Sequence, residues 1–177
     1  MIVGEAQSAS LYFRAVKWTV STPAVSSCHG DGTGLPCPCA NTGAPGHGCA
    51  NSAHASGAQL SASGQASVGA DTLTLAATGL TGAFAVFYQG TASIAPVVLD
   101  DGIGCVGGVI RRLGTVPVVA AAGAYPEAGD ASISVRGAIP ASGGTHHYQC
   151  FYRNASGLFC PPATSNRTNA LTIVWTP

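Results

Sequence analysis

The stretch that divides this chain reads Cys28-His29-Gly30-Asp31-Gly32-Thr33-Gly34-Leu35-Pro36-Cys37-Pro38-Cys39, and Gly46-His47-Gly48-Cys49 follows it closely. Four of the seven cysteines therefore lie in one loop. Glycine and proline are so frequent here that neither a helix nor a regular strand can run through the loop. We therefore expect covalent cross-links, and four cysteines suffice for two disulfides. The loop (28–52) separates an N-terminal strand-like arm (1–27) from a longer body (53–177).

The composition favours an extracellular protein and excludes nucleic-acid binding. Charged residues make up only 8% of the chain, the net charge is zero, and Lys17 is the only lysine. Nucleic-acid binding requires clustered basic residues, which this chain lacks. A surface covered by small neutral residues, together with seven cysteines, is typical of secreted or cell-surface proteins. Such a surface also repels other copies weakly, which favours self-association.

No apolar stretch reaches the length of a membrane span, because glycine, serine or proline interrupts each one. Residues 1–5 also lack the basic region and apolar core that mark a secretory leader. We therefore expect no membrane span, and we expect any leader to be missing from this sequence.

The body shows short strands separated by turn residues. Leu73 and Leu75 alternate with threonines, and Ile133 and Val135 alternate with polar neighbours, which is the two-residue period of a half-buried strand. The predicted strands are 60–68, 72–78, 83–89, 94–99, 108–113, 116–120, 132–136, 145–153 and 171–176. Since no stretch has a helical period, we predict an all-β fold with almost no helix. The body is then an antiparallel β-sandwich or jelly roll.

An ordered set of motifs runs through residues 28–177. They are Cys28-His-Gly-Asp-Gly, Cys37-Pro-Cys-Ala-Asn-Thr-Gly, Gly46-His-Gly-Cys49-Ala-Asn-Ser, Phe87-Tyr-Gln-Gly90, Asp101-Gly-Ile-Gly-Cys105, Ile110-Arg-Arg-Leu-Gly114, Tyr125-Pro126, Ser134-Val-Arg-Gly-Ala-Ile-Pro140, Tyr152-Arg-Asn-Ala155, Phe159-Cys160 and 169–177. In these motifs the chain resembles a poorly characterised β module of secreted proteins from planctomycetes, myxobacteria and related environmental bacteria. The resemblance implies a C-terminal piece of a larger extracellular protein and brings no catalytic residues. Cys150 departs from it, because an aliphatic residue is expected there.

Six cysteines are predicted to form disulfides. Cys37 and Cys39 cannot easily bond each other across one proline, and Cys28 and Cys49 are their nearest partners. We expect the remaining pair to be Cys105 with Cys160, joining two strands of the body. That leaves Cys150, which is either free and buried or paired between molecules. A zinc site is the competing interpretation, with ligands from residues 37–39 and 47–49, but structural zinc sites usually contain paired CxxC spacings.

No residue pattern predicts catalysis, a cofactor or a metal ion. The chain has no GxSxG, HExxH or phosphate-binding loop. His146 and His147 are neighbours on a predicted strand, so their side chains point to opposite faces and cannot hold one ion together. The acidic residues of 30–32 and 100–102 are typical of turns. We therefore predict a protein that is not an enzyme and binds no cofactor or metal.

Aromatic residues on the strand 145–153 offer a candidate sugar-binding face. Tyr148 and Tyr152 are the candidate glycan contacts, with Phe151 beside them, although aromatics in a strand-rich body more often belong to the core. Asn154 and Asn166 each begin an N-glycosylation pattern, a short pattern that also arises by chance.

The arm suggests how the protein is used. Val16, Trp18 and Val20 alternate with polar residues, and Leu11 and Phe13 lie in the opposite phase, so residues 8–21 are predicted to form a strand. This strand is either the first strand of its own sandwich or an addition to the sheet of a neighbouring copy. Strand addition of this kind propagates into a filament, because the contact joins two different surfaces.

We therefore predict a structural subunit of an extracellular fibre or surface assembly, a homo-oligomer that polymerises through residues 8–21. The alternative is a monomeric carbohydrate-binding or adhesion module of a secreted protein.

Overall fold

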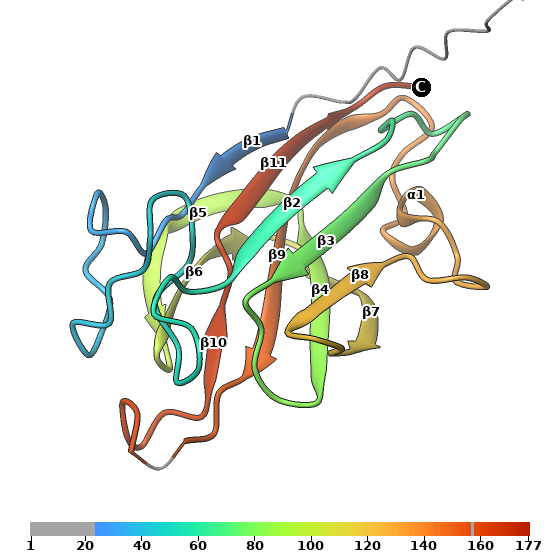
Figure 1. The fold of residues 1–177 in the computed structure, drawn as a ribbon. Helices are drawn as coiled ribbons and strands as arrows, with labels where there is room; N and C mark the ends of the chain where they lie inside the picture. The colour runs from blue at the N-terminus through green and yellow to red at the C-terminus, as the bar shows by residue number, and fades with distance from the viewer. Residues whose placement is uncertain (1–23, 157) are drawn as a thin grey trace, which may run out of the picture.

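Antiparallel β-sheet accounts for nearly all the regular structure between Ala24 and Pro177 (Figure 1). The structure is a computed structural model and describes residues 24–156 and 158–177. The predicted arm strand, 8–21, lies outside the described residues. The prediction of an all-β antiparallel sandwich is confirmed.

The larger sheet has six strands in the order β1-β11-β9-β4-β7, with β10 paired to β9 off this path. Its strands are β1 (Ala24–Ser27), β4 (Phe84–Gly90), β7 (Arg111–Pro117), β9 (Gly144–Arg153), β10 (Ser165–Arg167) and β11 (Ala170–Trp175). The ten-residue strand β9 lies between β11 and β4, with Leu171 opposite Tyr148 and Phe87 opposite Cys150.

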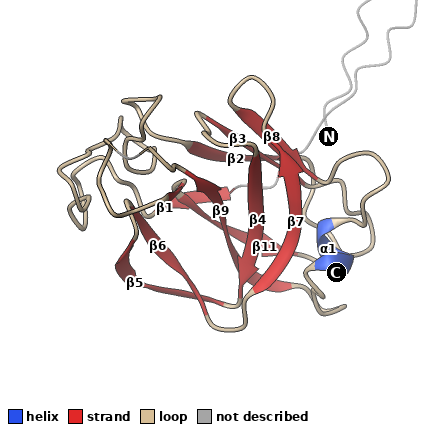
Figure 2. Ribbon diagram, turned by 90° about the horizontal axis from the view of Figure 1, so that it is seen from below, coloured by secondary structure: helices blue, strands red, loops and turns tan. Residues whose placement is uncertain are grey.

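A three-stranded sheet and a hairpin cover the two faces of the larger sheet (Figure 2). The small sheet contains β2 (Gln59–Ser63), β3 (Thr74–Thr78) and β8 (Ala122–Tyr125). The hairpin consists of β5 (Ala92–Leu99) and β6 (Gly102–Gly107) and lies on the opposite face, as an outer layer. The hairpin follows directly from β4, because only Thr91 separates β4 from β5.

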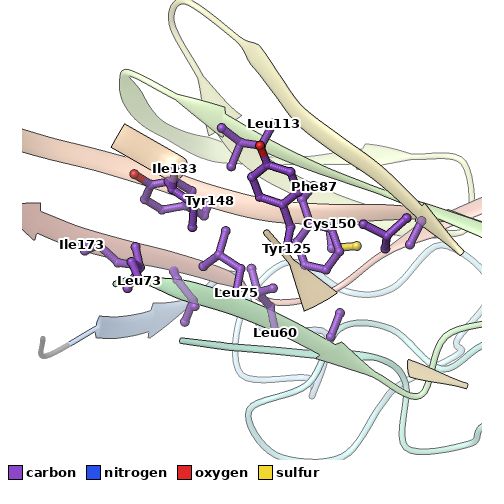
Figure 3. Close-up of a cluster of buried hydrophobic side chains, with 14 of the residues drawn as sticks. Leu60, Leu73, Leu75, Phe87, Leu113, Tyr125, Ile133, Tyr148, Cys150 and Ile173 are labelled. Carbon is purple, nitrogen blue, oxygen red and sulfur yellow. The ribbon is translucent and has the colours of Figure 1, made fainter. Parts of the chain in front are cut away.

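The main core fills the space between the two sheets. Figure 3 shows Phe87 and Tyr148 of the larger sheet facing Leu73 and Leu75 near the small sheet. These four side chains are at most 2% exposed. Burial of each contributes about 2 kcal/mol, so the alternating apolar residues of β3, β4 and β9 hold the layers together.

One predicted strand, 132–136, is wrong. The structure forms helix α1 (Ile133–Arg136) there, with Arg136 N–H bonded to Ser132 O and Gly137 N–H bonded to Ile133 O. The Asp71 carboxylate accepts the Ser134 N–H at 2.7 Å in the first turn. A helix of one turn is too short to show a helical period of apolar residues in the sequence. Tertiary contacts therefore determine the conformation of this segment.

Three further predicted strands are wrong in their bounds. The strand predicted at 60–68 ends at Ser63, and those predicted at 108–113 and 116–120 are one strand, Arg111–Pro117. The chain instead turns between β6 and β7, with Gly108 at φ +74°, a conformation that favours glycine. Strands β1, β6, β8 and β10 were not predicted from the sequence.

Candidate functional site

Three disulfides join the glycine-rich loop to itself and to the body. Cys37 bonds Cys49, whereas Cys28 bonds Cys105 and Cys39 bonds Cys160, across 77 and 121 residues of sequence. The six cysteines are those predicted to be paired, but the expected Cys105–Cys160 bond is wrong. Both body cysteines bond to the loop, because β6 lies in the outer layer beside the start of the loop. The loop is therefore fastened to the hairpin and to the segment before β10.

These disulfides leave no thiolate in the loop for a zinc ion. His47, the other candidate zinc ligand, has Nδ1 3.1 Å from the Pro45 carbonyl oxygen. Within the described ranges, no group of three or more histidine, cysteine or acidic side chains could hold a metal ion.

Cys150 is free and fully buried, so the alternative of a bond between molecules is wrong for this fold. Its side chain lies in the main core between the two sheets (Figure 3). Burial raises the pKa of the Cys150 thiol, which keeps it protonated and unreactive.

Five buried asparagines support the loop and the strand ends. Two of them were predicted from the sequence only as glycosylation sites, and the structural role of all five was not predicted. They are Asn41, Asn51, Asn154, Asn166 and Asn169. Asn51, for example, accepts the backbone N–H of His54 at 2.8 Å and donates to the Tyr152 hydroxyl at 3.0 Å. The available signal was the recurrence of four of them inside the motifs quoted above, whereas Asn166 lies outside those motifs, on β10. Their amides supply the hydrogen bonds that an irregular loop backbone lacks.

Gln149 connects the larger sheet to the outer hairpin. Its Nε2 donates to Ile103 O at 2.8 Å and to Thr168 O at 2.7 Å, and its Oε1 accepts the Cys105 N–H at 3.3 Å. The Tyr88 hydroxyl donates to the same Oε1 at 2.9 Å. Gln149 is therefore a buried structural residue.

The predicted sugar-binding tyrosines lie in the core, so that prediction is wrong. Tyr148 and Tyr152 are both 0% exposed. Trp175 Nε1–H donates to the Tyr148 hydroxyl at 2.7 Å. Phe151, on the opposite face of β9, is half-buried and stacks beneath the Arg167 guanidinium, 5.4 Å from the ring centre. Burial raises the pKa of both tyrosine hydroxyls.

The N-glycosylation prediction is wrong in this fold as well. Asn154 and Asn166 are at most 1% exposed, and the side-chain amides of both form hydrogen bonds within the protein. The Asn154 Oδ1 accepts the Ser52 hydroxyl at 2.6 Å, and Asn166 Nδ2 donates to Ala50 O at 3.0 Å. A sugar on either nitrogen would have no room and would displace these bonds.

Burial and local hydrogen bonds shift the pKa values of several described titratable groups. His146 is buried and His147 half-buried, and burial lowers the pKa of both. Asp31 accepts hydrogen bonds from Thr33 and from the Gly46 N–H at 3.0 Å, which lower its pKa to about 2 and brace the loop. Asp101 is fully buried, and burial raises its pKa.

A polar hollow of about 310 Å³ lies beside β7. Glu127, Asp130 and Arg136 contribute its charges, but the Arg136 Nε–H is bonded to Leu113 O and Asp130 accepts the Glu127 N–H. No histidine, serine or cysteine lines it. The hollow offers no nucleophile activated by a base.

The most unusual surface of the described chain is strand β5. Its side chains are exposed from Ser93 to Leu99, including Ile94, Val97, Val98 and Leu99 at 40–48%. The strand pairs only with β6, so its other edge is free of backbone pairing. Soluble monomers rarely leave an apolar edge strand open, because it pairs with strands of other chains.

Within residues 24–156 and 158–177, no helix combines the length and apolar character that a membrane crossing requires. No protein-family model, no curated protein and no solved structure matches this chain, so its resemblance to secreted bacterial modules stays a prediction.

Proposed function

We propose that this protein is a non-enzymatic structural subunit of an extracellular fibre or surface layer, and that it assembles through residues 8–21. The observation that supports this most is the open, apolar edge of β5. Three disulfides suit a protein that folds and functions in an oxidising environment outside the cell.

The mechanism follows from the chemistry of edge pairing. A strand donated by one copy gains main-chain hydrogen bonds to an exposed sheet edge and places alternate side chains in surface pockets. The donated strand and the receiving edge are different surfaces, so each added copy presents a new edge. The near absence of charge, with seven basic and seven acidic residues, removes the repulsion that would oppose close stacking of copies.

Truncation tests this proposal. Deletion of residues 1–21 should give monomers by light scattering and electron microscopy, whereas deletion of residues 1–7 should leave particles of the same size as the full chain. Because Trp18 and Thr19 have opposite phases in the predicted strand, Trp18→Asp should block assembly more strongly than Thr19→Asp. Assembly of the 1–21 deletion as efficient as that of the full chain would overturn the proposal.

The carbohydrate-binding alternative has lost the residues that supported it. With Tyr148 and Tyr152 buried, a sugar-binding face would need other exposed aromatics. Phe84 is the one large aromatic side chain of the described ranges that is more than half exposed, at 59%. A single ring is a small platform for a sugar, so we favour assembly.

A further inference from the structure

We infer that the free edge of β5 is the acceptor for residues 8–21 of a second copy. This inference rests on the proposed function and adds to it the site at which the neighbouring strand binds. The occupant is a strand of the same protein, and the contact is backbone pairing along the outer hairpin.

The hydrogen-bond pattern of the hairpin leaves a donor and an acceptor free. Val98 lies opposite Ile103 in the β5–β6 register. Ile103 O and Cys105 N–H are bonded to the side chain of Gln149, which lies on the side of β6 away from β5. In an antiparallel pair, residues alternate between hydrogen-bonded and non-hydrogen-bonded positions, so Val98 and Ile103 form a non-hydrogen-bonded pair. The N–H and C=O of Val98 therefore point outward, toward an incoming strand.

Side-chain amides cover the corresponding edges of two other strands. The amide of Asn169 accepts the Leu60 N–H at 2.7 Å and donates to Leu60 O at 3.1 Å, which occupies the edge of β2. Gln149 occupies the free edge of β6 in the same way. An edge whose groups are already bonded offers little to an added strand.

The remaining edges are short, charged or packed. β1 has four residues and β10 has three. β7 begins with two exposed arginines, Arg111 and Arg112, and its register with β4 is interrupted by a bulge. β8 lies beside β7, where the Tyr125 ring packs against Gly114. Charges, bulges and shortness are the features by which edge strands avoid pairing. β5 contains Pro96 and a register irregularity between Ser93 and Val97, and the Arg167 guanidinium donates to Leu99 O at 2.9 Å. Its open edge is therefore the short regular stretch Val97–Leu99, whose own side chains carry no charge.

The sequence of the arm complements this edge. Residues 92–99 contain no charge, and the arm from Leu11 to Val20 is mostly apolar, with Arg14 and Lys17 as its charges. The hairpin turn presents the exposed carboxylate of Asp100, which has the opposite sign and accepts the Ser165 hydroxyl.

The position of β1 favours a second copy over the chain's own arm. β1 runs from Ala24 to Ser27, and the next residue, Cys28, is bonded to Cys105 of the hairpin. Residues 1–23 therefore attach at the end of β1 that is remote from β6. To pair with β5 of its own body, the arm would have to turn back along β1. Pairing with β5 of a second copy does not require this turn.

Val98→Pro tests the inference directly. Proline removes the outward N–H of Val98 and leaves the β6 hydrogen bonds of Val97 and Leu99 in place, and edge strands tolerate proline at such positions. We expect the protein concentration at half assembly to rise about tenfold or more, since a hydrogen bond is lost and the ring obstructs the incoming strand. Val98→Thr keeps the N–H and is the matched control, expected to assemble within about twofold of the unaltered protein.

A measurement on the unaltered protein covers the case in which Val98→Pro does not fold. Hydrogen exchange should slow in the peptide 92–99 on assembly, relative to the 1–21 deletion. Slowing in 24–27 or 111–117 with 92–99 unchanged would overturn the inference. Normal assembly of a folded Val98→Pro, with the 1–21 deletion still monomeric, overturns β5 as the acceptor and leaves the proposed function intact. Assembly of the 1–21 deletion overturns both.

Discussion

The side-chain amide of Asn154 donates a hydrogen bond to the carboxylate of Asp101, and each side chain is at most 1% exposed. Asn154 begins the connection after β9, whereas Asp101 lies in the hairpin turn between β5 and β6. The other Asn154 atom, Oδ1, accepts the Ser52 N–H at 3.1 Å. This contact therefore joins the loop, the larger sheet and the hairpin at one buried point.

The burial of Asp101 predicts a pH-dependent stability. Burial raises its pKa above the ordinary value of 3.8, and its Oδ1 has no hydrogen-bond partner among the described residues. The folded state thus binds this proton more tightly than the unfolded state. Its contribution is most favourable below pH 3.8 and is lost as the pH rises through the raised pKa. Asp101→Asn should remove that loss.

Guanidinium unfolding between about pH 3 and pH 8 measures this effect. The free energy of unfolding of Asp101→Asn, relative to the unaltered protein, should increase with pH. Thr145→Ala, at an exposed position on β9, is the control and should show no such trend. A constant difference across this range would contradict the assignment.

Substitution of Gln149 should cause a large loss of stability. Gln149→Leu keeps the size of the side chain but leaves Ile103 O, Thr168 O and the Cys105 N–H without their partner. Each abandoned buried group costs about 1–3 kcal/mol, so the free energy of unfolding should fall by about 3 kcal/mol or more. Thr145→Ala, exposed on the same strand, should change it by less than about 0.5 kcal/mol. Similar losses in the two variants, measured by urea unfolding, would show that Gln149 is not a central contact.

The free thiol of Cys150 should not react with thiol reagents in the folded protein. Cys150 is 0% exposed and the other six cysteines are paired. A thiol reagent such as Ellman's reagent should therefore detect no thiol in the native protein. In denaturant without reductant it should detect one thiol per chain. Two or more thiols, or a covalent dimer on a non-reducing gel, would contradict the disulfide pattern.

The sequence predicted the strands whose side chains alternate against a single core. The strands predicted at 72–78, 83–89, 145–153 and 171–176 agree with β3, β4, β9 and β11 to within two residues at each end. β6 escaped prediction because three of its six residues are glycine. The structure gives the reason, since a Cβ at Gly104 or Gly107 would lie 2.5 Å from Leu99 or Ile94. Tertiary packing favours glycine there, because Leu99 and Ile94 would have to shift to admit a larger residue, and this outweighs the low strand propensity of glycine.

The cysteine pairing and the open edge of β5 depend on how the hairpin packs on the larger sheet. The spacing of residues in the sequence does not specify this packing. Cys28 meets Cys105 because the hairpin folds back over the larger sheet, and no local pattern specifies that return. Residues 94–99 were predicted as a strand, but an apolar strand with both faces exposed has the same sequence pattern as a buried one. Whether the edge of a strand is open also depends on side chains far away in the sequence, since Gln149 bonds the edge of β6 and Asn169 bonds the edge of β2.

The placement of Tyr148 predicts a loss of stability rather than a loss of binding. Tyr148→Phe removes the acceptor of the buried Trp175 Nε1–H and leaves the ring in place. The free energy of unfolding should fall by about 1–2 kcal/mol, the cost of an unpaired buried donor. Phe84→Leu, at a site 59% exposed, should cost less than about 0.5 kcal/mol. Thermal and urea unfolding, with particle size measured in parallel, check both effects, and assembly should be unchanged in either variant. Loss of glycan-array binding in Tyr148→Phe at unchanged stability would contradict the core position of this residue and restore the carbohydrate-binding alternative.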